Sequence, residues 1–186
     1  MKKLIVAAVA IAMSVAANAA QVKWSTSYEV CNGPSEGLTS ATVAYLIDSA
    51  ALSQSEIYDA IVGGKTLSEA VAGNFVKDAA MSEGMIGNQS FDAFSAGQAK
   101  TLYMVCFDAD INAVYFSEEI TKTMLGTGSQ SYGFESNSSI DAIAADMSTF
   151  DTSVGGWVST AAVPEPTSGL LMLLGMAGLA LRRRRA

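Results

Sequence analysis

Short apolar runs with the two-residue period of β-strands dominate the middle of the chain. This alternation predicts strands over residues 22–29, 41–48, 112–118 and 153–160. In the second of these, Val43, Tyr45 and Ile47 fall on one side of the strand. The unbroken run 101–107 (TLYMVCF) predicts a central strand buried on both faces, since it combines β-formers without polar interruption. Residues 108–112 then form a hairpin to the next strand.

Helical signals are fewer and shorter. Residues 53–56 (SQSE) are a capping-box sequence, apolar residues follow at helical spacing, and Gly63-Gly64 ends this helix. A second short helix is expected over 67–72 and one or two helical turns over 140–147, while the Gly- and Ser-rich stretch 126–139 is expected to be a loop. The pattern predicts an α+β fold around a mostly antiparallel sheet, with a compact β-sandwich as the alternative.

Two further apolar runs lie at the ends of the chain. At the amino end, Lys2 and Lys3 precede the run 4–17, and Ala17 and Ala19 form an A-x-A site. A basic region, a short apolar region and a small-residue site are typical of a secretory signal peptide. We therefore expect residues 1–20 to be removed by signal peptidase after Ala19 or Ala20, and residues 21–162 to form an exported domain.

The carboxyl end, residues 163–186, has three parts in order. Pro164, Glu165 and Pro166 come first, and an apolar segment follows over 168–181. A positive run, Arg182, Arg183, Arg184 and Arg185, then closes the chain. The apolar segment would be about 21 Å long as a helix, shorter than a hydrocarbon core of ~30 Å. We expect it to be a short transmembrane helix whose arginines stay in the cytoplasm by the positive-inside rule.

This tail resembles the PEP-CTERM sorting signal of Gram-negative bacteria, in which a Pro-Glu-Pro motif, a short apolar helix and an arginine run occur in that order. The resemblance covers only the carboxyl-terminal tail. It implies recognition by an exosortase, an integral-membrane cysteine protease-transpeptidase, with removal of the tail near the motif. It also implies an association with exopolysaccharide and biofilm formation, and a location in the cell envelope, at the cell surface or in the extracellular matrix.

The charge of the chain and its lack of histidine argue against several classes of function. The net charge is −7, but six of the positive charges lie in the two terminal segments. Without these six and the one tail acid, the exported domain carries about −12, so it repels nucleic acid and anionic lipid headgroups. The chain has no histidine, which removes the usual general base near neutral pH and the commonest transition-metal ligand. We expect a non-catalytic protein without a cofactor.

Two constellations in the middle are candidate sites. Cys31 and Cys106 are the only cysteines, and in an oxidising compartment they are expected to form a disulfide. The set Asp108, Asp110, Asn112 and Glu119 matches part of a calcium-loop spacing, with oxygen ligands at alternate residues. The sixth position of that loop is Ala113 where a turn-permitting glycine is required, which favours a polar hairpin over a calcium site.

Carboxylate pairs and aromatics raise two other hypotheses. The pair Glu118-Glu119, or Asp108 with Asp110, has the residue types of a glycosidase, although seventeen acids in a small domain make such pairs frequent by chance. The aromatics Trp24, Trp157 and Tyr132 suit either a carbohydrate platform or a core, and we expect a core. The leading hypothesis is a non-catalytic surface or matrix protein. The alternative is a small carbohydrate- or calcium-binding module of an exopolysaccharide layer, and the third is a secreted hydrolase.

Overall fold

A computed structural model describes residues 21–26, 30–33, 36–37, 42–82, 84–91, 94–134 and 143–161. Its strands are β1 (Gln21–Thr26), β2 (Cys31–Gly33), β3 (Glu36–Gly37), β4 (Val43–Asp48), β5 (Phe75–Ala80), β6 (Gln89–Phe91), β7 (Ala99–Asp108), β8 (Ala113–Ser117), β9 (Ile120–Thr123), β10 (Ser129–Phe134), β11 (Ile143–Ala144) and β12 (Gly155–Ser159). Its helices are α2 (Gln54–Val62) and α3 (Leu67–Ala70).

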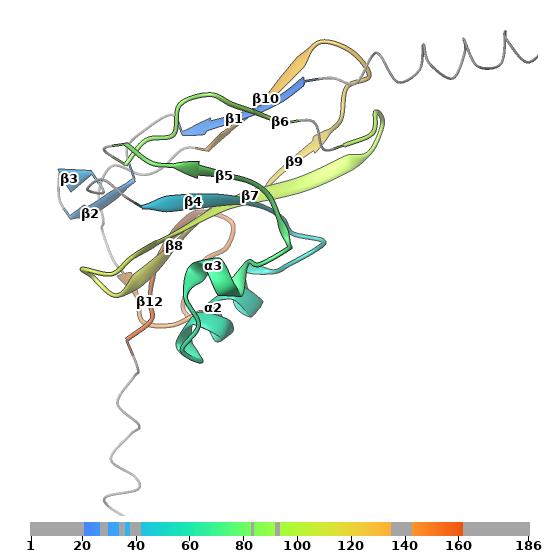
Figure 1. Cartoon of the computed structure of the whole chain (residues 1–186). Helices are drawn as coiled ribbons and strands as arrows, with labels where there is room; N and C mark the ends of the chain where they lie inside the picture. The colour runs from blue at the N-terminus through green and yellow to red at the C-terminus, as the bar shows by residue number, and fades with distance from the viewer. Residues whose placement is uncertain are drawn as a thin grey trace, which may run out of the picture.

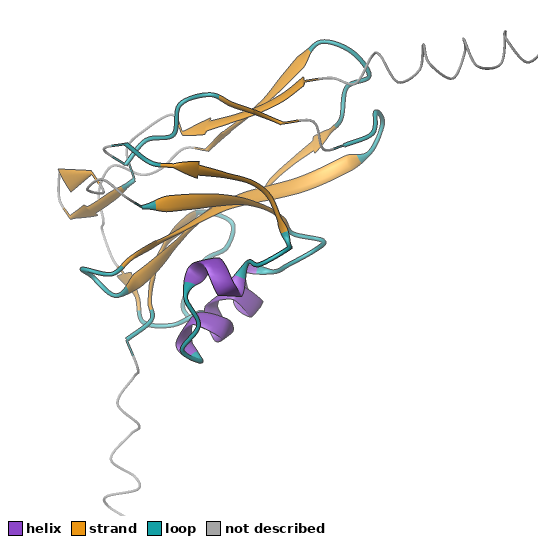
Figure 2. Cartoon of the chain, in the orientation of Figure 1, coloured by secondary structure: helices purple, strands orange, loops and turns teal. Residues whose placement is uncertain are grey.

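The elements stack in three layers (Figure 1). The middle layer is a seven-stranded sheet in the order β11-β12-β8-β7-β4-β5, with β9 also paired to β7. A three-stranded sheet, β10-β1-β6, covers one face. The two helices cover the other face (Figure 2). A mostly β fold with short helices confirms the α+β prediction, and the two stacked sheets also give it the sandwich character of the alternative.

Neighbouring strands are mostly antiparallel, as predicted, but two pairs are parallel. β1 runs parallel to β10, with Trp24 opposite Tyr132, and β11 runs parallel to β12. In the first pair, β10 lies in a stretch for which the sequence predicted a loop. In the second, β11 lies in a stretch for which it predicted helical turns.

Two apolar cores lie on opposite faces of the large sheet. The inner core fills the space between the sheets, where Trp24, Tyr132 and Phe134 of the small sheet pack against Leu46 and Met104 of the large one. The outer core lies under the helices and joins Ile57, Leu67 and Val71 to the sheet. Burying each large apolar side chain contributes roughly 1.5–3 kcal/mol, so the two cores supply most of the stabilisation.

β7 takes part in both cores, as its unbroken apolar run predicted. Leu102, Met104 and Cys106 face the inner core, whereas Tyr103 and Val105 face the outer core. All five are fully buried. β4 and β8 flank β7 in antiparallel register, and the predicted hairpin after Asp108 joins β7 to β8.

The helices begin where the sequence predicted. Ser53 accepts a hydrogen bond from the Glu56 amide, and the Glu56 carboxylate accepts one from the Ser53 amide. Thr66 and Glu69 repeat this capping box at α3. Two reciprocal hydrogen bonds satisfy amides that a helix start would otherwise leave unpaired. Gly63 ends α2 as expected.

Two predictions for the second half of the chain were wrong. Residues 129–134 form β10 rather than loop, because Tyr132 and Phe134 alternate into the inner core beside β1. Within 140–147 the described part contains β11 and bends instead of helical turns, since Ile143 and Ala144 pair with β12. In both cases pairing with a distant strand overrides the local pattern.

The amino-terminal and closing strands agree with prediction in part. β1 covers residues 21–26 of the predicted 22–29, residues 27–29 lie outside the described ones, and β12 lies within the predicted 153–160. No helix among the described residues is long and apolar enough to cross a membrane. The predicted transmembrane segment, 168–181, lies outside them.

Gly155, at the start of β12, provides a test of the sheet packing. Its φ is +77°, and an added Cβ would lie 2.7 Å from the Glu118 amide nitrogen and 2.8 Å from the Phe116 carbonyl oxygen. Crowding and a left-handed backbone together should make Gly155→Ala cost about 3 kcal/mol or more of unfolding free energy. Gly128→Ala is the matched control, because Gly128 has φ +88° with open space around it, and it should cost about 1 kcal/mol. Equal losses in urea unfolding would contradict this packing.

The capping boxes predict acid sensitivity. Hydrogen bonds from the backbone and side chain of Ser53 lower the pKa of Glu56, and those of Thr66 lower the pKa of Glu69. A folded-state pKa below the unfolded value stabilises the fold above the unfolded pKa of about 4.3 and loses that stabilisation as the pH falls. Unfolding free energy measured from pH 6 to pH 3 should therefore decline less steeply in Glu56→Gln than in the parent. A Glu56→Gln curve that declines as steeply as that of the parent would contradict this role of the capping box.

Candidate functional site

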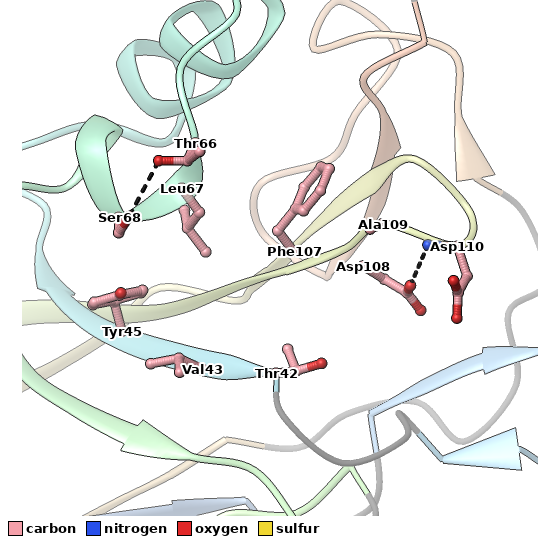
Figure 3. Close-up of a pocket in the computed structure, with 10 residues that line it drawn as sticks. All are labelled: Thr42, Val43, Tyr45, Thr66, Leu67, Ser68, Phe107, Asp108, Ala109 and Asp110. Atoms are coloured by element: carbon pink, nitrogen blue, oxygen red, sulfur yellow. Dashed lines mark hydrogen bonds between the residues drawn. The ribbon is translucent and has the colours of Figure 1, made fainter.

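A pocket of about 400 Å³ opens at the end of the large sheet where β4 begins and β7 ends (Figure 3). Its volume lies within the roughly 300–1,000 Å³ typical of small-ligand sites. Thr42, Val43 and Tyr45 form one side, at the start of β4. Residues 66–68, at the start of α3, form the second side, and residues 107–110 of β7 and its hairpin form the third.

Two aromatic rings and two aliphatic side chains give the pocket an apolar part. Tyr45 is half-buried and packs edge-on against Phe75, with ring centroids 5.2 Å apart. Phe107 is also half-buried and joins the outer core, as does Leu67. Val43 is 37% exposed. Tyr45, Leu67 and Phe107 are anchored in the outer core, and together with the exposed Val43 they line the pocket.

Two carboxylates stand on the hairpin side of the pocket. Asp108 is only 6% exposed, whereas Asp110 is exposed. The Asp110 amide donates a hydrogen bond of 2.8 Å to Oδ1 of Asp108, which fixes the orientation of the Asp108 carboxylate. Figure 3 shows both carboxylates on the same side of the hairpin. The turn conformation thus brings two acids together at the rim.

Hydroxyl groups complete the lining on the α3 side. The Thr66 and Ser68 hydroxyls lie 3.1 Å apart, and the Thr66 hydroxyl also donates to the Glu69 carboxylate at 2.8 Å. The capping box of α3 therefore holds this part of the pocket in place. The pocket as a whole combines hydroxyls, carboxylates and apolar surface on rigid elements.

The predicted calcium constellation is not assembled. Asp108, Asp110 and Asn112 share the hairpin, but β8 carries the chain away before Glu119, roughly 17 Å along a five-residue strand. Asn112 adopts φ +53°, and its carbonyl oxygen accepts hydrogen bonds from the amide and hydroxyl of Thr160. In the part of the chain that the structure describes, no group of three or more Asp, Glu or Cys residues could hold a metal ion.

The nominated carboxylate pairs are separated in the same way. Glu118-Glu119 follows β8 at one end, and Asp108 with Asp110 precedes it at the other. The structure therefore does not combine the two pairs into one cleft.

The aromatics proposed as a platform or a core belong to the core, as expected. Trp24 and Tyr132 are fully buried and Trp157 is 4% exposed. The Tyr132 hydroxyl donates to the Lys100 carbonyl oxygen at 3.1 Å, and burial raises the pKa of Tyr132 to about 12. None of the three side chains offers a face to a ligand.

Cys106 is a free cysteine, fully buried in β7. The predicted disulfide to Cys31 is accordingly not formed in this structure, and the Cys31 side chain lies outside the described ones. Burial, with Asp108 nearby, raises the pKa of the Cys106 thiol well above its ordinary value. Such a thiol is a poor nucleophile.

Sequence reasoning identified one side of the pocket and missed the other two. Asp108 and Asp110 were singled out, but as weak candidate calcium ligands or as a carboxylate pair of a hydrolase. Tyr45 was assigned only to a strand face, and Thr66 and Ser68 carried no signal except the capping box of Thr66 with Glu69. The alternation of residues 41–48 places Tyr45 on one face of a strand, but it does not indicate which other elements border that face.

The sorting residues lie at the ends of the chain and outside the described residues. These are Ala17, Ala19 and Ala20 at the expected cleavage site, Pro164, Glu165 and Pro166 of the motif, and the arginines 182–185. β12 (Gly155–Ser159) is the last strand among the described residues, which end at residue 161.

Comparison with known families identifies the tail. Residues 162–185 match the family model of the PEP-CTERM protein-sorting motif. This confirms the resemblance drawn from the sequence, and the protein carries a signal that marks proteins for export to the cell surface of Gram-negative bacteria. The signal implies processing by an exosortase, which is a membrane protein. No curated protein matches the chain.

The burial of Cys106 predicts slow alkylation. Iodoacetamide should leave the Cys106 peptide unlabelled in the folded protein and label it rapidly after unfolding without reductant, as quantified by mass spectrometry. Rapid labelling of the folded protein would contradict the burial. A Cys106 peptide that labels only after unfolding and reduction would instead restore the disulfide predicted from the sequence.

Proposed function

We propose that the protein is a non-catalytic component of the cell envelope or extracellular matrix, delivered by an exosortase-type sorting system. The observation that carries this proposal is the match of residues 162–185 to the sorting-motif model. Within that range Pro164-Glu165-Pro166, the apolar segment and the arginine run occur in the order that the signal requires.

The amino end supports the same route. Residues 1–20 have the basic, apolar and small-residue regions of a signal peptide, so the domain would be translocated first. The four arginines would then stop the tail on the cytoplasmic side. Both ends favour one orientation, with the domain outside, where processing near the motif would release it from its anchor.

The chemistry of the domain supports a non-catalytic role. The sequence has no histidine to serve as a general base. Its buried Cys106 has a thiol pKa raised far from the range of an activated nucleophile. An acidic surface of about −12 favours a protein that remains soluble in the matrix. The association of such tails with exopolysaccharide, which the resemblance implies, supports a role in a biofilm matrix.

The intact mass of the protein from envelope and culture-medium fractions of its native host tests this proposal. We expect a species that lacks the first nineteen or twenty residues and everything beyond the Pro-Glu-Pro region. Replacing Pro164 and Pro166 together by alanine should leave the tail attached. Without the two prolines, the apolar helix could extend through the motif, and the extended segment that the protease needs would be lost.

Met172→Leu is the matched control, since it lies outside the Pro-Glu-Pro motif and keeps the segment 168–181 apolar. It should be processed like the parent. If the parent protein retains its arginine tail in every fraction, the tail is a permanent anchor and the proposed sorting route is wrong.

A further inference from the structure

We propose that β1 exchanges between copies of this chain, so that β1 of one copy fills the place between β10 and β6 of another. Such exchange joins copies without a new contact surface, since the exchanged strand makes the same contacts that it makes within its own chain. This inference goes beyond the proposed function, and it does not depend on whether the tail is removed.

β1 occupies the centre of the small sheet (Figure 1). It pairs in parallel with β10 along its whole length and in antiparallel with β6. Among the described strands, β10 and β6 each pair with β1 and with no other strand. Val22 and Trp24 of β1 also fill the inner core. A copy whose own β1 is displaced therefore has a split sheet and an exposed core, which favour binding of another β1.

β10 is held in place by contacts that do not involve β1. The Gln130 side-chain amide donates a hydrogen bond of 3.1 Å to the Thr123 carbonyl oxygen of β9. The Tyr132 hydroxyl donates one of 3.1 Å to the Lys100 carbonyl oxygen of β7. These bonds fasten β10 to the large sheet from the side opposite to β1. The strand that receives β1 therefore stays ordered when β1 leaves.

β1 can leave and enter because it lies at one end of the exported domain. Gln21 is the first or second residue after the expected signal-peptide cleavage, so no loop has to be threaded. Its partner Ser129 follows more than a hundred residues later, and pairing over such a separation is slow. Within the described residues the buried Trp24 indole N–H has no hydrogen-bond acceptor, which weakens the hold of the core on β1.

The place between β10 and β6 fits β1 of a second copy. Its inner side takes apolar side chains at alternate residues, which Val22 and Trp24 supply. Lys23, between them, lies beside Ser131 and Ser90, so an incoming β1 meets no like charge there. The domain charge of about −12 opposes the approach of two copies. Physiological salt screens such repulsion beyond roughly 8 Å.

Protein concentration decides between the two arrangements, because the same contacts form in both. A strand tethered to its own domain has an effective concentration on the order of millimolar. Exchange is therefore rare in dilute solution and frequent where copies are crowded, as in a surface layer or a matrix.

Single-cysteine variants test the inference. One chain carries Lys23→Cys and an isotope-labelled second chain carries Ser131→Cys, both with Cys31→Ala and Cys106→Ala. Both are produced in the native host and purified in whichever processed form they take, then mixed in urea, refolded together and oxidised. Neither chain has both cysteines, so a link between positions 23 and 131 forms only when β1 of one copy lies beside β10 of another. Mass spectrometry of the linked peptides should show at least about a ten-fold rise in this link from about 10 µM to about 1 mM protein.

Two controls make the outcome decisive. Lys23→Cys mixed with Asp59→Cys, an exposed position of α2 on the other face of the large sheet, reports random collisions and should link about ten-fold less. A chain carrying both Lys23→Cys and Ser131→Cys should link within itself when dilute, which shows that the geometry permits the bond.

A link between positions 23 and 131 of different copies that never exceeds the collision control overturns the inference. Failure of the doubly substituted chain to link within itself overturns the β1–β10 pairing on which the inference rests. An arginine tail retained in every fraction would overturn the proposed function and leave the cross-linking result unaffected.

Discussion

The burial of β7 on both faces is the constraint on which the rest of the structure depends. Its side chains alternate between the inner and outer cores, so both covering layers, the small sheet and the helices, must be present to shield it from water. The strands on either side of β7 are fixed by its register. The apolar run of β7 ends at Phe107, and after Asp108 the chain turns into the hairpin that borders the pocket.

The sequence predicts well the features that depend on neighbouring residues. The capping boxes are complete within four residues. The run 101–107 is an unbroken series of β-forming residues, which by itself predicts a strand buried on both faces. β10 is different, because Ser129–Phe134 is rich in small polar residues and becomes a strand only beside β1, more than a hundred residues earlier. β11 could not be predicted for the same reason. Its two residues form a strand because they pair with the edge of β12. Local spacing carries no information about such partners.

The pocket could not be predicted for the same physical reason. Its three sides come from residues 42–45, 66–68 and 107–110, which approach one another only after β4 has paired with β7 and α3 has packed on the outer core. The aspartates of the hairpin were recognisable as chemically active residue types. Glu119, which would have completed a calcium set with them, lies at the far end of β8.

The hairpin also relates the pocket to the tail. Thr160 donates through both its amide and its hydroxyl to the Asn112 carbonyl oxygen, so the end of the described chain is tied to the hairpin that bears Asp108 and Asp110. From Ala161 to Pro164 a chain spans at most about 11 Å. The described domain therefore ends on the hairpin, three residues before the sorting motif. Under the proposed sorting route, removal of the tail would free this end of the domain, so the hairpin is the part of the fold whose surroundings would change most on processing.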